Sequence, residues 1–300
     1  MKSYASLRKG FSDTLSEFWH VYRHKTGDVA GTVASVVNAS REMESLAEQK
    51  LGLGLQDLEM LEIGAGQQLL RSKYFSTKNR VTAVDYDVVL QGLDPAACWK
   101  VLRKNGAKRL VKTVLRKAAG IDRAYWRELE KHAGPKVRER LPVVQGDAHA
   151  LPWPDSSFDF TYSFSVFEHL ADPAKCLEEA VRVLRPGGGF CIGTHLYTSD
   201  SGAHDPRTFV LPHSEPPYWA HLRPAYQNNV KPNATCNRWR LSQWEGLFRK
   251  KCPGVVFEHK RAGTATLEPE LSRLRSRGEL REYTDPELLT VDIWALWRKR

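Results

Sequence analysis

The sequence predicts an α/β protein built on a doubly wound, mainly parallel sheet with helices on both faces. Two observations predict this class. Short apolar runs alternate with amphipathic stretches between residues 58 and 197, and the first run ends in an acidic residue followed by two glycines. A chain of 300 residues with 41% hydrophobic residues is long enough to bury one large core. We therefore expect one large domain over residues 55–300, preceded by a helical segment over residues 1–54.

The helical segment is predicted to be a hairpin of two helices. The first helix carries apolar residues at helical spacing from Phe11 to Tyr22 and ends near Gly27. The second begins after Asp28 and ends near Gly54. Two interpretations stay open, because such a hairpin either packs on the sheet as a cap or covers a ligand pocket as a lid.

The first two strands are predicted to end in acidic residues. The first strand, over residues 58–62, ends at Glu62, and Gly64 and Gly66 predict a sharp turn toward a ligand before a helix over residues 67–74. The second strand, over residues 81–85, ends in Asp85, where a carboxylate accepts hydrogen bonds from both hydroxyls of a ribose.

The remaining elements follow in the same alternation. Asp172 is expected to be the N-cap of a helix over residues 174–184, and the run from Pro186 to Gly189 is expected to end it. A loop rich in proline, histidine and aromatic residues occupies residues 199–232. The other strands are expected at residues 142–145, 158–164, 190–197, 255–259 and 290–297, and the other helices at 242–250 and 269–277.

Residues 88–140 form an insertion about twice as long as a helical crossover requires. It contains 14 Lys or Arg and 5 Asp or Glu, so its net charge of +9 supplies almost all of the chain's +10. Apolar residues between Trp99 and Ala118 fall largely on one helical face, with basic residues between them, and Gly106 weakens the prediction of one continuous helix. Such a segment lies on an anionic membrane, binds a phosphate-bearing acceptor or presents a solvated face, and these interpretations stay open.

Composition excludes several classes of protein. No run of 18 apolar residues is present and the N-terminus lacks the apolar core of a signal peptide, so we expect a soluble, cytoplasmic protein. The five cysteines are odd in number and scattered, without a Cys-x-x-Cys pair. This pattern argues against a disulfide framework and against a structural zinc site, and no metal ligands are predicted.

Four motifs resemble those of the class I S-adenosylmethionine-dependent methyltransferases that act on small acceptors, which carry a methyltransferase-11-like domain. They are Leu-Glu-Ile-Gly-Ala-Gly at residues 61–66, Val84-Asp85, Gly-Asp-Ala at residues 146–148 followed by Leu151-Pro152, and Arg-Val-Leu-Arg-Pro-Gly-Gly at residues 182–188. The resemblance implies a Rossmann-like sheet of seven strands, the last of them antiparallel. It also implies S-adenosyl-L-methionine as the cofactor. The helical hairpin and the basic insertion would be additions to this fold.

The resemblance also assigns the cofactor-binding residues, position by position. Glu62, Gly64 and Gly66 would shape the pocket for the methionine end of the cofactor. Asp85 would accept hydrogen bonds from the ribose hydroxyls, with Tyr86 beside the adenine.

Three further positions complete the implied cofactor site. Asp147 would accept a hydrogen bond from the adenine amine, Ala148 would flank the ring through its backbone, and Ser163 would line the cofactor or the acceptor. The chain departs from the family pattern at Gln67, where a third glycine is frequent. A dinucleotide fold would instead need glycine at Leu69, where a pyrophosphate approaches a helix N-terminus. S-adenosylmethionine has no phosphate and does not need that contact.

A hydroxyl acceptor requires a general base, and histidine is suited to this role near neutral pH. The candidates are His195, at the end of the fifth strand, and His204 with Asp205 as an orienting carboxylate. Glu168-His169 is expected to belong to the scaffold.

We therefore predict O-methylation of a small-molecule acceptor, or of one linked to a lipid or glycan. Peripheral association with an anionic membrane surface through residues 99–118 is part of this prediction. Aromatic residues around the loop after the fifth strand are expected to line the acceptor pocket or to form a small core; they are Tyr197, Tyr218, Trp219 and Tyr226. The acceptor and the oligomeric state stay open.

Two other functions compete with this prediction. The basic insertion suits RNA, yet the fourth strand is followed by Ser163-Phe164-Ser165-Val166 rather than by the Asn/Asp-Pro-Pro-aromatic motif of amino-methylating enzymes. A Pro-Cys nucleophile is also missing, so a nucleic-acid acceptor is less favoured. The other alternative is a protein that binds S-adenosylmethionine without catalysis, against which the acids Asp85 and Asp147 argue.

Overall fold

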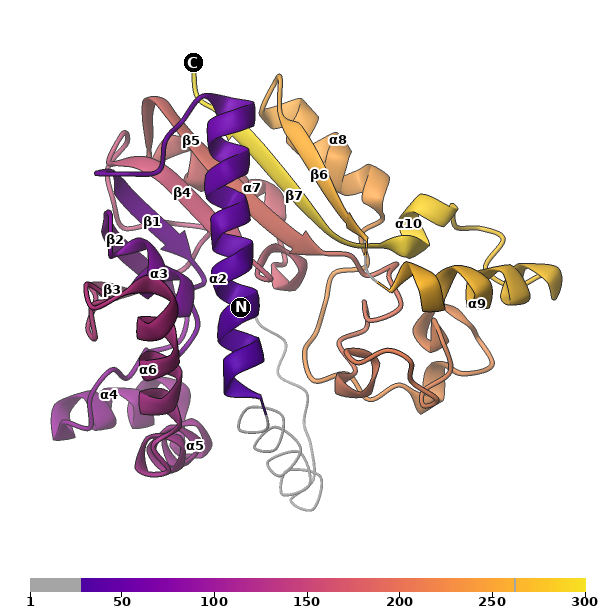
Figure 1. The fold of residues 1–300 in the computed structure, drawn as a ribbon, viewed down its shortest axis with the longest axis horizontal. Coiled ribbons are helices and arrows are strands. Elements are labelled where there is room, and N and C mark those ends of the chain that lie inside the picture. The colour runs from indigo at the N-terminus through magenta and orange to yellow at the C-terminus, as the bar shows by residue number, and fades with distance from the viewer. Residues whose placement is uncertain (1–27, 262) are drawn as a thin grey trace. The chain divides into compact units, whose positions relative to one another are not determined.

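The computed structural model describes residues 28–261 and 263–300. Within these residues, seven strands form one sheet in the order β3-β2-β1-β4-β5-β7-β6 (Figure 1). β1 pairs in parallel with β2 and β4, β2 pairs in parallel with β3, and β7 pairs antiparallel with β6. The predicted α/β class and the antiparallel last strand are therefore confirmed. The strands are β1 (Glu59–Ile63), β2 (Arg80–Asp85), β3 (Val143–Gln145), β4 (Phe158–Phe164), β5 (Leu184–His195), β6 (Val256–Arg261) and β7 (Thr290–Arg298).

The described chain divides into two compact units. The N-terminal unit comprises residues 28–163, 178–191 and 298–300. The C-terminal unit comprises residues 164–177, 192–261 and 263–297. The helices are α2 (Val29–Leu46), α3 (Leu70–Phe75), α4 (Pro95–Asn105), α5 (Ala107–Ala118), α6 (Ile121–Ala133), α7 (Pro173–Arg182), α8 (Leu241–Lys251), α9 (Thr264–Ser276) and α10 (Asp285–Leu289).

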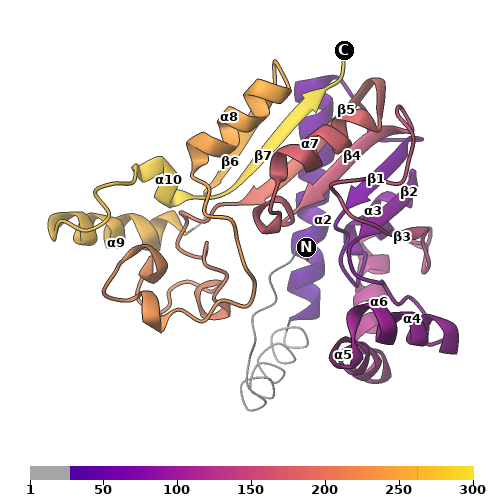
Figure 2. The ribbon, with the colours of Figure 1, turned by 180° about the vertical axis from the view of Figure 1, so that it is seen from behind.

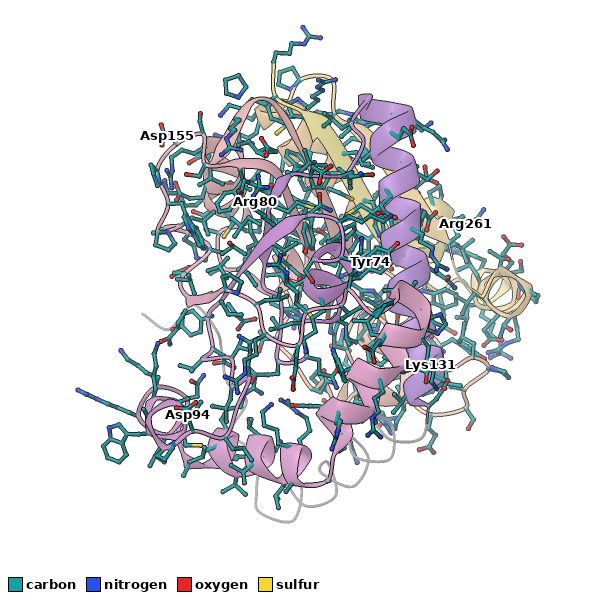
Figure 3. All side chains as sticks on the ribbon, turned by 60° about the vertical axis from the view of Figure 1, so that its left-hand side comes forward. Tyr74, Arg80, Asp94, Lys131, Asp155 and Arg261 are labelled. Carbon is teal, nitrogen blue, oxygen red and sulfur yellow. The ribbon has the colours of Figure 1, made fainter. Side chains whose placement is uncertain are left out.

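Helix α2 is the second helix of the predicted hairpin, and the first lies outside the described residues. Its start is fixed by Asp28, whose Oδ1 accepts a hydrogen bond from the backbone N–H of Gly31 at 2.7 Å. Its buried face packs against α3 and α6. Tyr74 of α3 lies beside α2 and donates a hydrogen bond to Glu44 at 2.9 Å (Figure 3).

Helix α3 begins three residues later than expected. Leu69 has φ of 55°, in the left-handed region, so residues 67–69 form a turn and the helix starts at Leu70. This is the position at which a dinucleotide fold would carry its third glycine. Burial of the Leu69 side chain, which is 1% exposed, offsets the cost of that backbone conformation.

The basic insertion folds as three helices, α4, α5 and α6, which lie together in the N-terminal unit (Figures 1 and 2). Gly106 separates α4 from α5 with φ of 86°, so the stretch from Trp99 to Ala118 is two helices rather than one. The two ends of the insertion meet, because Gln91 donates to the carbonyl of Leu141 at 2.8 Å and accepts from its N–H at 2.9 Å.

Strand β5 begins at Leu184, whereas the sequence predicts a start at residue 190. The run from Pro186 to Gly189, expected to end a helix, lies within the strand. Its backbone is paired in the N-terminal unit, since Gly187 N–H donates to Lys299 O at 2.8 Å and Lys299 N–H donates to Gly188 O at 2.7 Å. Pairing with the C-terminal residues therefore extends the strand.

In the C-terminal unit, a core formed by Trp219, Leu222, α9 and α10 holds the loop after β5. Trp219 is fully buried, and Tyr197 and Tyr218 pack against the same cluster, so the interpretation as a small core is correct for these three residues. Tyr226 is not part of the cluster. Helix α9 begins at Thr264 rather than at Pro269, which lies inside it. Helix α10 was not predicted, and Thr284 caps it with Glu287 in a capping box.

Replacing Gly188 by alanine should destabilise the protein by about 1–3 kcal/mol, because a Cβ atom there would stand 2.5 Å from the carbonyl oxygen of Asp159. Gly246→Ala is the matched control: this exposed glycine in α8 has open space at its Cβ, so alanine should stabilise the helix by up to about 1 kcal/mol. Chemical denaturation measures both. Equal effects of the two substitutions would contradict the steric argument.

Candidate functional site

The turn after β1 is shaped by two glycines in the left-handed region. Gly64 has φ of 77° and Gly66 has φ of 66°, values that glycine adopts without steric cost. A Cβ atom at Gly66 would meet nothing within 4 Å, so the backbone borders open space there. The turn is bound to β2, because the N–H of Gly64 donates to the carbonyl of Val84 at 2.8 Å.

Asp85, at the end of β2, organises this turn. Its Oδ2 accepts the N–H of Gly66 at 2.8 Å, and its Oδ1 accepts the N–H of Asp87 at 2.9 Å. Burial raises the pKa of Asp85, although these backbone hydrogen bonds oppose the shift. Asp87 in turn forms an ion pair of 2.8 Å with Arg109 of α5. The basic insertion is therefore attached directly to the loop that follows Asp85.

Glu62 is buried at the end of β1, with 4% of its surface exposed. Burial raises its pKa to about 7, against the opposing charge of Arg71 and a hydrogen bond from Ser72. The hydroxyl of Tyr162 on β4 also donates to Glu62, at 3.5 Å. The Glu62 carboxyl therefore gains or loses its proton near neutral pH.

The other predicted cofactor residues lie at the ends of β2, β3 and β4. Burial alone would raise the pKa of Asp147, but hydrogen bonds from His149 outweigh it, so the pKa is lowered. Ala148 follows Asp147 directly, and Tyr86 is 43% exposed. Ser163 is fully buried and donates to the carbonyl of Ile63 at 2.8 Å, which links β4 to the end of β1.

His195 is the last residue of β5 and belongs to a hydrogen-bonded chain in the C-terminal unit. Its Nδ1 lies 3.1 Å from Asp292 of β7, and its Nε2 lies 3.1 Å from the hydroxyl of Ser201. Burial alone would lower the pKa of His195, but the hydrogen bond and charge of Asp292, together with Glu168, outweigh it and raise the pKa. An imidazole oriented by a carboxylate in this way is suited to accept a proton at Nε2.

His204 and Asp205 do not form the predicted pair of base and orienting carboxylate. Asp205 is bound by the guanidinium of Arg207 at 2.6 Å and by the N–H of Lys231 at 2.8 Å. The side chain of His204 instead lies against the rings of His195 and His169, with centroids 5.0 and 4.9 Å away. Burial lowers its pKa to about 3, assisted by these two histidines. The predicted pairing was wrong because the side chains of His204 and Asp205, although adjacent in sequence, contact different partners.

Comparison with known proteins identifies the domain that these residues belong to. Residues 104–192 match the family described as "Methyltransferase domain", and they contain β3, β4, α7 and most of β5. A Mycolicibacterium smegmatis protein named a probable S-adenosylmethionine-dependent methyltransferase is 41% identical over 88 residues, 28% of this chain and 32% of that protein. Residues 104–192 therefore match a methyltransferase domain, and the similarity extends to S-adenosylmethionine-dependent methyltransferases. S-adenosylmethionine is the cofactor of this family.

Two further similarities are more limited. The 27-O-demethylrifamycin SV methyltransferase of Amycolatopsis mediterranei is 38% identical over 60 residues, which are 20% of this chain and 22% of that enzyme. The crystal structure of the YcgJ protein of Bacillus subtilis aligns with 88% of this chain over 98% of the YcgJ chain. The sequence identity is 16% and the TM-score is 0.41. The chain thus spans about a third or less of the length of the Mycolicibacterium and Amycolatopsis relatives.

The matched segment contains Asp147, Ala148 and Ser163, whereas the glycine turn and Asp85 precede it. The predicted cofactor residues therefore lie on both sides of the basic insertion, and those that follow it fall within the matched segment.

None of the described helices is long and apolar enough to span a membrane.

Sequence reasoning missed the partners of the two central titratable groups. Ser72 binds Glu62, and Asp292 binds His195 from a strand far along the chain. One signal was available for Asp292, because it is the acid within the otherwise uncharged run from Thr290 to Trp297. Ser72 gave no comparable signal, since a serine in a short helix is common.

Glu62→Gln should reduce the loss of stability with rising pH. The folded-state pKa of about 7 lies above 4.5, so the folded protein holds this proton and loses stability as the pH rises from about 4.5 to 7. Removing the ionisable group should eliminate on the order of 3 kcal/mol of that decline. Urea denaturation between pH 4.5 and 8 measures it, with Glu59→Gln as the control. An unchanged slope in Glu62→Gln would contradict the assigned cause.

Proposed function

We propose that this protein transfers the methyl group of S-adenosylmethionine to an acceptor hydroxyl, with His195 as the general base. The observation that carries the proposal is a series of hydrogen bonds from Asp292 through His195 to Ser201. In it a carboxylate orients a buried imidazole in a way that suits proton transfer. The match to a methyltransferase domain supports the transfer of a methyl group. That the methyl group goes to an oxygen atom is our inference.

The residues of the N-terminal unit fit the adenosyl cofactor. The turn at Gly66 leaves open space where a side chain would stand, and no third glycine is needed because the cofactor has no phosphate. Asp85 uses one lone pair of each oxygen for the turn, and each oxygen keeps another for a ribose hydroxyl. We propose the same site for Glu62, Gly64, Tyr86, Asp147, Ala148 and Ser163.

The cofactor, when bound, supplies a methyl carbon activated by a sulfonium. The protein's own residues then have two tasks, to align the acceptor oxygen with that carbon and to take up its proton. In this proposal Nε2 of His195 receives the proton in place of its contact with Ser201. Asp292 stabilises the imidazolium that results and holds Nδ1–H in position.

The acceptor we propose is a small molecule, or a headgroup linked to a lipid or glycan. The name of the Amycolatopsis relative, which describes methylation of a small-molecule oxygen, supports the first class. The insertion supports the second, because Trp99, Val111 and Leu115 are 65%, 55% and 49% exposed among basic residues. Exposed apolar side chains beside lysines and arginines are typical of helices that lie on anionic membranes.

His195→Gln should lower kcat by roughly 10²- to 10⁴-fold with little change in affinity for S-adenosylmethionine, because it removes the proton acceptor alone.

Asp85→Ala should weaken cofactor binding by roughly 10- to 100-fold, since it removes a charged hydrogen-bond acceptor. Isothermal titration and transfer of a labelled methyl group into extract fractions measure the two quantities.

The outcomes separate the competing functions. Label in the lipid, glycan or small-molecule fraction supports the proposal, and label in RNA supports the nucleic-acid alternative. Cofactor binding without any transfer would favour a non-catalytic binding protein. Full activity of His195→Gln would contradict its role as the base.

Val111→Asp combined with Leu115→Asp should weaken binding to vesicles that contain phosphatidylserine by at least 10-fold, because it places two acids on the exposed apolar stripe of α5. Binding should also fall with rising salt concentration. Val210→Asp is the matched control, since that valine is 64% exposed outside the insertion. Vesicle sedimentation measures the binding of the unmodified protein, the double variant and the control. Equal binding by all proteins would contradict the proposed contact surface.

A further inference from the structure

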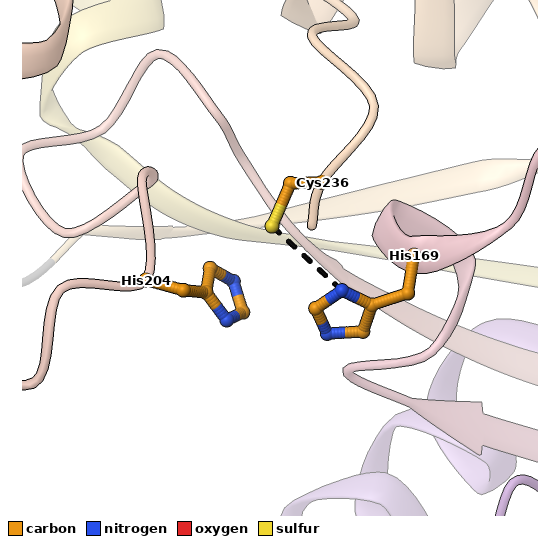
Figure 4. A group of neighbouring side chains, drawn as sticks. All are labelled: His169, His204 and Cys236. Atoms are coloured by element: carbon orange, nitrogen blue, oxygen red, sulfur yellow. Dashed lines mark hydrogen bonds between the residues drawn. The ribbon is translucent and has the colours of Figure 1, made fainter. Parts of the chain in front are cut away.

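Three side chains in the C-terminal unit bring together two imidazoles and a thiol. His169 lies in the 3₁₀ helix η2 (Phe167–His169), His204 in the loop after β5, and Cys236 in the segment before α8. Their potential ligand atoms all lie within 4.8 Å of one another, and Sγ of Cys236 is 3.7 Å from Nδ1 of His169. Figure 4 shows the three side chains turned toward a common point from three separate segments.

The Nε2 atom of His204 is buried and has no hydrogen-bond partner among the described residues. A buried polar nitrogen without a partner carries a desolvation cost, so its retention requires a reason. The atom belongs to the residue that the sequence predicted as a base and that the structure separates from Asp205. A ligand at this nitrogen would remove the cost.

We propose that His169, His204 and Cys236 bind a zinc ion, with the fourth coordination position left to water. Two imidazole nitrogens and a thiolate form a donor set that zinc prefers, at bond lengths of about 2.0–2.1 Å to nitrogen and 2.3 Å to sulfur. Ligand atoms on a tetrahedral zinc ion are then about 3.3–3.8 Å apart. The separation of 3.7 Å between Cys236 and His169 already fits this geometry. A contraction of about 1 Å by side-chain rotation would bring the widest pair within range.

Glu168 supplies a partner for the metal-bound histidine. Both of its carboxylate oxygens are buried, with the backbone N–H groups of Glu168 and His195 nearby, and Oε1 lies 4.0 Å from Nε2 of His169. Nδ1 of His169 now lies 2.8 Å from the carbonyl of Thr235. Coordination through Nδ1 would move the ring proton to Nε2, which faces Glu168. Carboxylates commonly orient metal-binding histidines in this way, so Glu168 is a positioning residue.

The proposed ion would connect three segments that share little regular secondary structure. Backbone hydrogen bonds already join the segment at Cys236 to the other two, from Asn237 N–H to Glu168 O at 2.6 Å and from Asn233 N–H to His204 O at 2.9 Å. The ion would add a link through the side chains. Binding to the folded state alone would stabilise the unit by mass action. This inference does not depend on the proposed methyl transfer.

Untagged, full-length protein, stripped with chelator and reloaded with zinc, tests the site. We expect one zinc ion per chain by elemental analysis, a higher melting temperature with zinc, and a thiolate-to-metal charge-transfer band when cobalt(II) replaces it. Cys236→Ser should abolish that band, and His204→Ala should weaken zinc binding at least 100-fold. Cys98→Ser and His132→Ala are the matched controls, because both residues lie in the insertion and should leave binding unchanged.

The cobalt band of the unmodified protein reports the thiolate directly, so the test does not depend on the folding of any variant. Less than 0.1 zinc ion per chain would overturn the proposal, as would a band that persists in Cys236→Ser or tight binding of copper without zinc. Glu168→Gln should weaken zinc affinity by roughly 10- to 100-fold, with Glu245→Gln as its control. Unchanged affinity in Glu168→Gln would overturn its positioning role.

Discussion

The carboxylate of Asp85 is the point on which the N-terminal unit depends. It accepts backbone N–H groups from Gly66 and Asp87, and so fixes the turn after β1 to the end of β2. The turn can approach the acid only because Gly64 and Gly66 adopt left-handed conformations. The ion pair of Asp87 with Arg109 then attaches the basic insertion to the same place. A shared constraint therefore positions the glycine turn, Asp85 and the insertion.

The histidines of the C-terminal unit show how the choice of partner decides chemistry. Asp292 holds the ring of His195 through Nδ1, and Asp200 binds His213 at 2.5 Å, which anchors the loop after β5. His221 lies 2.7 Å from the carbonyl of Tyr197, and burial lowers its pKa to about 4. The Nε2 atom of His204 has no hydrogen-bond partner among the described residues, and its ring packs against the rings of His169 and His195.

The insertion combines a folded side with an exposed one. Val101 is buried with Val88 and Leu90, and the chain ends are joined by Gln91 and Leu141. Trp99 on α4, together with Val111 and Leu115 on α5, exposes apolar surface among basic residues, and contact of this apolar surface with water is unfavourable. This contrast is the physical reason for connecting the insertion with a membrane surface or a lipid-linked acceptor.

The sequence by itself determined the α/β class, the order of the strands along the chain and the glycine turn after β1, because hydrophobic periodicity and glycine conformation are local properties. It misplaced the starts of α3 and β5, because a left-handed leucine and pairing with the C-terminal residues are set by tertiary contacts. Only the tertiary structure joined His195 to Asp292 and gathered His169, His204 and Cys236. These residues are separated by tens of positions without any motif spacing, so only the packing of the folded chain brings their side chains together.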